Sequence, residues 1–283
     1  MFLDRMREAA QAKARRVVFP ELGDARVAEA ARRLVADGVC EAVPLGEITD
    51  AQVAALVSAR GMKEAMARRL LAKPLYRAAA MVAAGEADAM VAGADSPTRR
   101  VIEAAAMAIG LADGVSLPSS FFVMLFPDGR ELVFADCAVN VAPDANELAD
   151  IARASARSAE ALLGVAKVAM LSFSTGTSGA GESVERVRAA AEQAGFAGPV
   201  QADAALNAAI AAKKGIEGAG EANVLIFPSL DAGNIAYKLC QELAGAQALG
   251  PLLQGFRRPV CDLSRGASVD DIIAAATVTV AMA

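Results

Sequence analysis

Short apolar segments alternate with amphipathic helical patterns along nearly the whole of this 283-residue chain. The segments RRVVFPE and ADAMVAGA have apolar centres, as strands buried on both faces of a sheet do, and a helix-period stretch follows each of them. Parallel strands require such crossover helices, because a tight turn cannot join them. The pattern therefore predicts an α/β fold with mainly parallel sheets and helices on both faces.

One segment interrupts this alternation near the middle of the chain. The apolar runs FFVMLF (121–126) and ELVFADC (131–137) flank an Asp-Gly turn, a combination that predicts a β-hairpin. The turn-rich segment NVAPDA (140–145) follows, and the α/β alternation then resumes with a helix expected over 144–163. We therefore expect a first domain over residues 1–140 and a second domain after it.

The composition excludes several classes of protein. Hydrophobic residues make up 55% of the chain, yet no uncharged apolar stretch reaches the roughly 18–20 residues of a membrane span. Lys plus Arg (28) and Asp plus Glu (33) give a net charge of −5 without a basic block, so neither nucleic acid nor membrane is an expected partner. No signal peptide is visible, and the four cysteines lack CxxC spacing. We therefore expect a cytoplasmic protein with reduced thiols.

The chain contains no histidine. This removes the commonest zinc ligand and the usual general base, so we expect no metal site. Any acid–base chemistry must fall to a carboxylate, a lysine, a tyrosine or a cysteine.

Two of the four informative loops that follow predicted strands could bind phosphate, because ligands of parallel α/β sheets bind where strands lead into helices. In SFSTGTSGAGES, the hydroxyls of Ser174, Thr175 and Ser178 and three glycines could surround a phosphate, or the loop could be a plain connector. In GADSPTRR, Arg99 and Arg100 open a helix. Arginine forks match phosphate oxygens, although a solvated surface pair is the alternative.

The other two loops carry carboxylates, hydroxyls and an arginine. In PSLDAGNIAYK, Asp231 or Asn234 is expected to cap the next helix, and Asn234 is also a candidate substrate contact. In CDLSRGASVDD, Ser268 is expected to cap the last helix, with Asp270 and Asp271 in its first turn. A strand-to-helix turn explains these residues, but it does not explain an arginine at the strand tip.

That last loop suggests chemistry as well as capping. Ser264 and Arg265 end the strand, and Gly266 is expected to permit an unusual backbone angle. The sharper interpretation is that Arg265 holds an anion while an aspartate acts as a base.

These blocks resemble those of the phosphotransacetylases (phosphate acetyltransferases) and the related phosphate butyryltransferases, in a short form without a regulatory domain. The resemblance rests on VVFPELGDARVAEAA, GEADAMVAGA, FADCAVNVAP, VAMLSFSTGTSGAGESVERVRAA and GPLLQGFRRPVCDLSRGASVDDI, in the same order over nearly the whole chain. It implies two α/β domains of isopropylmalate-dehydrogenase-like architecture, an active-site cleft between them and a homodimer. It also implies that 253–283 complete the first domain, which leaves 141–252 for the second.

The implied activity is reversible acetyl transfer between acetyl phosphate and coenzyme A, which is a substrate and not a bound cofactor, with no metal in the chemical step. By motif, Ser264 and Arg265 match the family's Ser-Arg pair, and Asp271 matches the aspartate proposed as general base. Arg100 or Arg99 matches a second phosphate arginine. The chain is shorter than other members of the family, chiefly between residues 45 and 75.

Three other functions compete with this interpretation. A phosphate butyryltransferase, or another short-acyl specificity, would show the same motifs. A non-catalytic acetyl-CoA-sensing domain, like those appended to malic enzymes, is less favoured because Ser264, Arg265 and Asp271 are all present. A decarboxylating dehydrogenase would need a metal-binding aspartate cluster and a nucleotide loop, and the sequence shows neither.

Overall fold

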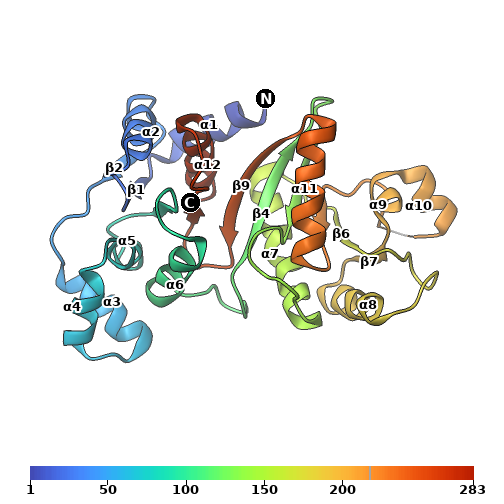
Figure 1. Ribbon diagram of the computed structural model, residues 1–283, viewed down its shortest axis with the longest axis horizontal. Coiled ribbons are helices and arrows are strands. Elements are labelled where there is room, and N and C mark those ends of the chain that lie inside the picture. The colour runs from blue at the N-terminus through green and yellow to red at the C-terminus, as the bar shows by residue number, and fades with distance from the viewer. Residues whose placement is uncertain (217) are drawn as a thin grey trace. The chain divides into compact units, whose positions relative to one another are not determined.

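The computed structural model describes residues 1–216 and 218–283, and they divide into two compact units (Figure 1). The first unit comprises Met1–Gly114 together with Gly250–Ala283, and the second comprises Val115–Leu249. Each unit contains parallel strands with helices packed against them. The expected α/β class is therefore confirmed.

The first unit is built around four parallel strands in the order β2-β1-β3-β10. Its helices form two groups, of which one contains α1, α2 and α12 and the other contains α3 to α6. The elements are α1 (Phe2–Lys13), β1 (Arg16–Val18), α2 (Ala25–Ala36), β2 (Glu41–Val43), α3 (Asp50–Arg60), α4 (Glu64–Leu71), α5 (Pro74–Ala83), β3 (Ala89–Ala92), α6 (Thr98–Ala108), β10 (Val260–Asp262) and α12 (Val269–Met282). The C-terminal segment thus supplies strand β10, which pairs with β3, and a helix that packs on α1 and α2.

The second unit has the strand order β4-β5-β8-β6-β7. Strands β5, β8, β6 and β7 run parallel, and β4 pairs antiparallel with β5. The elements are β4 (Ser119–Leu125), β5 (Glu131–Ala135), α7 (Ala145–Leu163), β6 (Val168–Leu171), α8 (Glu182–Ala194), β7 (Ala197–Val200), α9 (Ala202–Leu206), α10 (Ala208–Lys214), β8 (Val224–Ile226) and α11 (Leu230–Ala244). The hairpin and the helix expected over 144–163 are both present.

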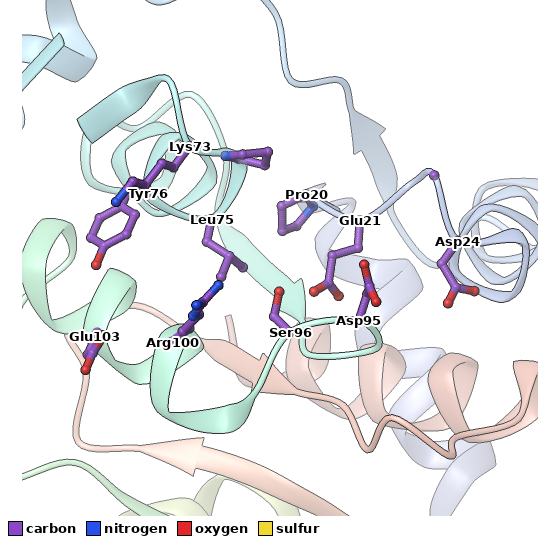
Figure 2. Close-up of a pocket in the computed structure, with 12 residues that line it drawn as sticks. Pro20, Glu21, Asp24, Lys73, Leu75, Tyr76, Asp95, Ser96, Arg100 and Glu103 are labelled. Atoms are coloured by element: carbon purple, nitrogen blue, oxygen red, sulfur yellow. The ribbon is translucent and has the colours of Figure 1, made fainter. Parts of the chain in front are cut away.

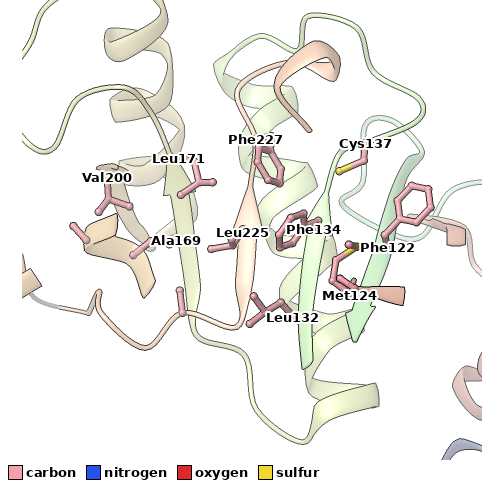
Figure 3. Close-up of a cluster of buried hydrophobic side chains, with 14 residues drawn as sticks. Phe122, Met124, Leu132, Phe134, Cys137, Ala169, Leu171, Val200, Leu225 and Phe227 are labelled. Carbon is pink, nitrogen blue, oxygen red and sulfur yellow. The ribbon is translucent and has the colours of Figure 1, made fainter. Parts of the chain in front are cut away.

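Aromatic side chains fill the centre of the second unit (Figure 3). The rings of Phe134 and Phe227 lie 5.2 Å apart between centroids, and Phe122 stacks on Tyr237 at 4.3 Å. Burial of such side chains stabilises the folded state by about 1.5–3 kcal/mol each. This core joins β4 and β5 to α11.

The division between the units differs from the boundary that the sequence suggested at residue 140. Strand β5 pairs with β8 from Val133 to Ala135, so the hairpin belongs to the second unit, which begins at Val115. The chain returns to the first unit at Gly250, near the expected residue 253.

One strand was missed altogether. Strand β9 (Gln247–Gln254) contains a Gly-Pro pair and pairs antiparallel with β10. Its glycine and proline lower the local strand propensity, and only pairing with a neighbour supplies its hydrogen bonds.

Within the described part of the chain, no helix has both the length and the apolar character that crossing a bilayer requires. Nor does that part contain a group of three or more Cys, Asp or Glu side chains placed to hold a metal ion.

Candidate active site

The loop from β10 to α12 exposes Ser264 and Arg265 at the carboxyl end of a parallel strand. The Ser264 hydroxyl accepts a hydrogen bond from the Gly266 N–H at 3.3 Å, and the Ser264 carbonyl accepts one from Ala267 at 2.9 Å. Among the described residues, the Arg265 guanidinium has neither a hydrogen-bond nor an ion-pair partner. An exposed, unpaired arginine at this end of a strand is available to bind an anion.

The expectation of an unusual backbone angle at Gly266 is wrong. Positive φ occurs at many glycines of this chain, but Gly266 does not adopt it. The turn is closed instead by the hydrogen bonds to Ser264, so a small residue is not required there for conformational reasons.

Asp271 is part of a capping box at the start of α12. Its Oδ2 accepts hydrogen bonds from the Ser268 N–H at 2.9 Å and the Ser268 hydroxyl at 2.7 Å, while the Asp271 N–H donates to Ser268 Oγ at 3.2 Å. The expected Ser268 cap is confirmed. In the described structure, the other oxygen of Asp271 has no partner, so this exposed carboxylate can still accept a proton.

Arg26 connects three loops, and sequence reasoning missed it. Its Nη1 donates to the carbonyls of Arg265 and Ala267 at 2.8 and 2.9 Å, and its Nη2 donates to the Ala94 carbonyl at 3.2 Å. The guanidinium also pairs with Asp24, the N-cap of α2, and this hydrogen-bonded pairing lowers the pKa of Asp24 to about 2. Arg26 therefore holds the backbone of the loop that carries Ser264 and Arg265.

The structure distinguishes the two arginines that begin α6. Arg99 is 88% exposed and pairs with Glu103 at 2.8 Å. Arg100 lines a cavity of about 680 Å³, together with Glu21, Asp95 and Ser96 (Figure 2). Arg100 is therefore the better candidate for a substrate contact.

Two carboxylates beneath these loops also escaped sequence reasoning. Asp262, at the end of β10, is only 1% exposed, and its Oδ2 accepts a hydrogen bond from the Thr98 hydroxyl at 2.5 Å. Burial raises the pKa of Asp262 to about 6. Glu21 Oε2 accepts hydrogen bonds from the N–H groups of Gly93 and Ala94, both at 2.8 Å. No local sequence signal marks either residue, because their partners lie far away along the chain.

In the second unit, the Gly/Ser loop after β6 is ordered by its own hydroxyls. Ser174 is buried with its Oγ 3.2 Å from Ser178 Oγ, and buried Thr175 exchanges two 3.0 Å hydrogen bonds with Gln201. The hydroxyls of Ser174 and Thr175 therefore serve the loop itself. A cavity of about 460 Å³ adjoins the loop, and its lining includes Ser178 and Lys214.

The expected cap of α11 by Asp231 or Asn234 is wrong, because Ser229 is the N-cap residue and accepts a hydrogen bond from Ala232. Asn234 lies within the helix and donates to the Cys137 carbonyl at 3.1 Å. Close approach at Gly233, where a Cβ would meet the Asp136 carbonyl at 2.4 Å, packs this helix on the loop after β5.

The structure thus separates the candidate residues into two groups. The first unit holds Ser264, Arg265, Gly266, Asp271, Arg99 and Arg100, and the second unit holds Ser174, Thr175, Ser178 and Asn234. Within the first unit, Arg26 links the β10–α12 loop to the β3–α6 loop.

Comparisons with known proteins identify the family of the chain. The family model described as phosphate acetyl/butaryl transferase matches residues 1–55 and 49–280. A phosphate acetyltransferase of Paracoccus denitrificans is 41% identical over 310 aligned residues, covering 98% of each chain. One from Acetivibrio thermocellus is 38% identical, covering 100% of this chain and 98% of its own.

Solved structures give the same result. A phosphotransacetylase from Streptococcus pyogenes superposes with a TM-score of 0.93 at 36% identity, covering 99% of this chain and 97% of its own. Another from Staphylococcus aureus gives a TM-score of 0.91 at 35% identity, with the same coverage of both chains. With both its sequence and its fold matched over nearly their full length, the chain belongs to the phosphate acetyl/butaryl transferase family.

Proposed function

We propose that this protein is a phosphate acetyltransferase, which transfers an acetyl group reversibly between acetyl phosphate and coenzyme A. The observation that carries the proposal is the exposed, unpaired guanidinium of Arg265 on a loop whose backbone Arg26 holds in place. A planar fork of this kind can donate two parallel hydrogen bonds to a phosphate group. The full-length similarity to phosphate acetyltransferases supports the same reaction.

In the proposed mechanism, Asp271 takes the proton from the thiol of coenzyme A, because the thiolate is the nucleophile. The sulfur attacks the acetyl carbonyl and forms the thioester bond. The bond between the carbonyl carbon and the bridging oxygen breaks, and phosphate leaves with that electron pair. Ser264 donates a hydrogen bond to the developing oxyanion, while Arg265 and Arg100 stabilise the charge of the departing phosphate.

An assay of thioester formation tests this reaction directly. The purified protein is incubated with coenzyme A and with acetyl, propionyl or butyryl phosphate, and thioester absorbance is followed. We expect the highest kcat/KM with acetyl phosphate. A preference for butyryl phosphate would assign the protein to the butyryl branch of the family, and no turnover with any of the three would favour the acetyl-CoA-sensing alternative.

We also propose that the cavity beside the Gly/Ser loop holds a phosphate group of coenzyme A. Lys214 lines this cavity and lies 3.0 Å from Asp203 and Gln201, so its ammonium group is held at the cavity wall. Lys214→Met is expected to raise KM for coenzyme A about three- to tenfold with little change in kcat, because one charge-assisted contact is lost. The exposed neighbour Lys213 lies outside that lining, so Lys213→Met is the matched control. An unchanged KM in Lys214→Met would leave the loop as a connector.

Arg26 is proposed as a positioning residue for the β10–α12 loop. Arg26→Met removes its hydrogen bonds to Arg265, Ala267 and Ala94, and we expect kcat/KM for acetyl phosphate to fall at least about tenfold. Arg26→Lys should recover part of this loss, because an ammonium group can still donate to the carbonyls. Arg32→Met serves as the control, since Glu29 on the surface of α2 is the one ion-pair partner of Arg32 among residues 1–216 and 218–283. Full activity in Arg26→Met would contradict the positioning role.

The protein is further proposed to be a cytoplasmic homodimer. Helix α11 carries an apolar row with four-residue spacing, Ile235, Leu239 and Leu243, and each side chain is more than half exposed. Exposure of such an apolar row to water is unfavourable, and its burial against the same helix of a second copy would remove it from water. Sedimentation should give a dimer, and Leu239→Asp should shift it toward the monomer.

Buried free thiols at Cys40, Cys137 and Cys261 are compatible with a reducing compartment.

A further inference from the structure

A buried carboxylate, Asp262, and a half-buried one, Glu21, approach the same glycine in the first unit. The Gly93 N–H donates to Glu21 Oε2 at 2.8 Å, and a Cβ on Gly93 would lie 2.5 Å from Asp262 Oδ1. Gly93 has a φ of +107°, so both the space and the backbone conformation require glycine. The ends of β1, β3 and β10 thereby bring Glu21 and Asp262 to the same point in the fold.

Each of these carboxylates keeps one oxygen buried and unpartnered. In the described structure, Glu21 Oε1 and Asp262 Oδ1 have no hydrogen-bond donor, although the other oxygen of each side chain is satisfied. Leaving two such oxygens ionised inside the protein is costly, and like charges in one site favour the retention of a proton. Burial, with a smaller contribution from the charge of Glu21, raises the pKa of Asp262 to about 6, and the hydrogen bond from Thr98 opposes this rise.

The surrounding charged groups do not neutralise the negative charge of these two carboxylates. Arg26 faces both Glu21 and Asp95, but its guanidinium is occupied by Asp24 and by three backbone carbonyls. Other charged side chains on the neighbouring elements include Arg99, Arg100 and Glu103 on α6 and Asp270 and Asp271 on α12, and Lys73 lines the same cavity as Glu21.

The loops that bind the substrate's phosphate in the proposed function begin at this pair. Arg265 follows Asp262 by three residues, and Arg100 follows Thr98 by two on the first turn of α6. Two negative charges at the base of these loops would repel a bound phosphate, whereas one would repel it less.

We propose that Glu21 and Asp262 form a positioning pair in which Asp262 takes up a proton when an anion binds to the loops of Arg100 and Arg265. This inference rests on the proposed function, because the phosphate group of the substrate is the anion concerned. The pair thereby couples substrate binding to proton uptake. Neither carboxylate is a catalytic residue, because the pair acts on the substrate only through the two loops and through its charge.

Calorimetric titration with sulfate between pH 5.5 and pH 8 tests this inference without the use of enzyme activity. Sulfate is a tetrahedral dianion that does not titrate in this range, so any pH dependence belongs to the protein. In the wild type, we expect the Kd of sulfate to rise about tenfold across this range as Asp262 loses its proton. Repetition in two buffers of different ionisation enthalpy should show proton uptake on binding.

Three variants separate the pair from other effects. Asp262→Asn keeps an acceptor for Thr98 but cannot ionise, so the Kd of sulfate should become independent of pH and proton uptake should disappear. Thr98→Val removes a hydrogen bond that lowers the pKa of Asp262, so the midpoint of the pH dependence should move upward. Asp95→Asn removes a carboxylate from the cavity that Glu21 and Arg100 line. It should change the Kd of sulfate without removing the pH dependence of this Kd.

A pH-independent Kd in the wild type, or an unchanged pH dependence in Asp262→Asn, would overturn the inference. If Asp262→Asn does not fold, an unmoved midpoint in Thr98→Val is sufficient to overturn it. These results are independent of the thioester assay. An active enzyme whose Kd for sulfate does not depend on pH would contradict only the inference about Glu21 and Asp262. A protein without acetyl transfer would contradict the proposed function.

Discussion

Asp271→Asn is expected to lower kcat by about 10²–10⁴-fold while KM for both substrates changes little, because a general base acts on the barrier and not on binding. In the structure, this substitution can remove the proton acceptor without disturbing the helix cap. Asp271 Oδ2 accepts hydrogen bonds from the N–H and hydroxyl groups of Ser268, and an asparagine carbonyl can accept the same two. The variant therefore keeps the cap of α12 and loses only the ability to take a proton. Steady-state kinetics with acetyl phosphate and coenzyme A measure the effect.

Two further substitutions separate catalysis from capping. Asp270→Asn is the matched control, because Asp270 is the preceding residue, is 81% exposed and pairs with Arg33 on the surface. Its kinetics should remain near those of the wild type. Asp271→Ala removes the cap as well and should cost about 1 kcal/mol of unfolding free energy. Normal turnover in Asp271→Asn would show that Asp271 is a capping residue only.

Arg265→Lys is expected to lower kcat/KM for acetyl phosphate about ten- to a hundredfold, although the positive charge is kept. Lysine presents a point charge on a flexible stem and cannot donate two parallel hydrogen bonds to two phosphate oxygens. The loss of one charge-assisted hydrogen bond costs about 1.5–3 kcal/mol. Because the Arg265 side chain has no partner within the described structure, the substitution should leave the fold unchanged. Inorganic phosphate should also inhibit this variant less than the wild type.

Arg99→Lys provides the comparison for this result. Arg99 is also exposed and lies at a helix start, but its guanidinium pairs with Glu103. The conservative change there should leave the kinetics with acetyl phosphate within about twofold of the wild type. If Arg265→Lys behaves like Arg99→Lys, the phosphate site lies elsewhere, and the loop after β10 is only a connection between a strand and a helix.

The α/β class and most of the individual elements could be predicted from the sequence. Local patterns determine them, because a buried parallel strand needs a short apolar run and a surface helix needs an apolar face and a cap. The caps at Asp24 and Ser268 and the hairpin around the Asp-Gly turn are examples in which neighbouring residues contain the whole signal. Strand β9 is the counterexample, since its Gly-Pro pair carries no strand signal and its partner β10 is required.

What only the tertiary structure decided is which distant residues meet. The sequence marked Ser264, Arg265 and Asp271, because their motif is contiguous. It could not mark Arg26, whose carbonyl partners at Ala94 and Arg265 lie 68 and 239 positions away. The pairing of Glu21 with Asp262 likewise depends on the parallel order of β1, β3 and β10, which brings the ends of three separated strands to Gly93. Sequence thus determined the local elements and one contiguous motif. Strand order determined the contacts of Arg26 and the approach of Glu21 and Asp262 to Gly93, because hydrogen bonds and burial depend on distance in space.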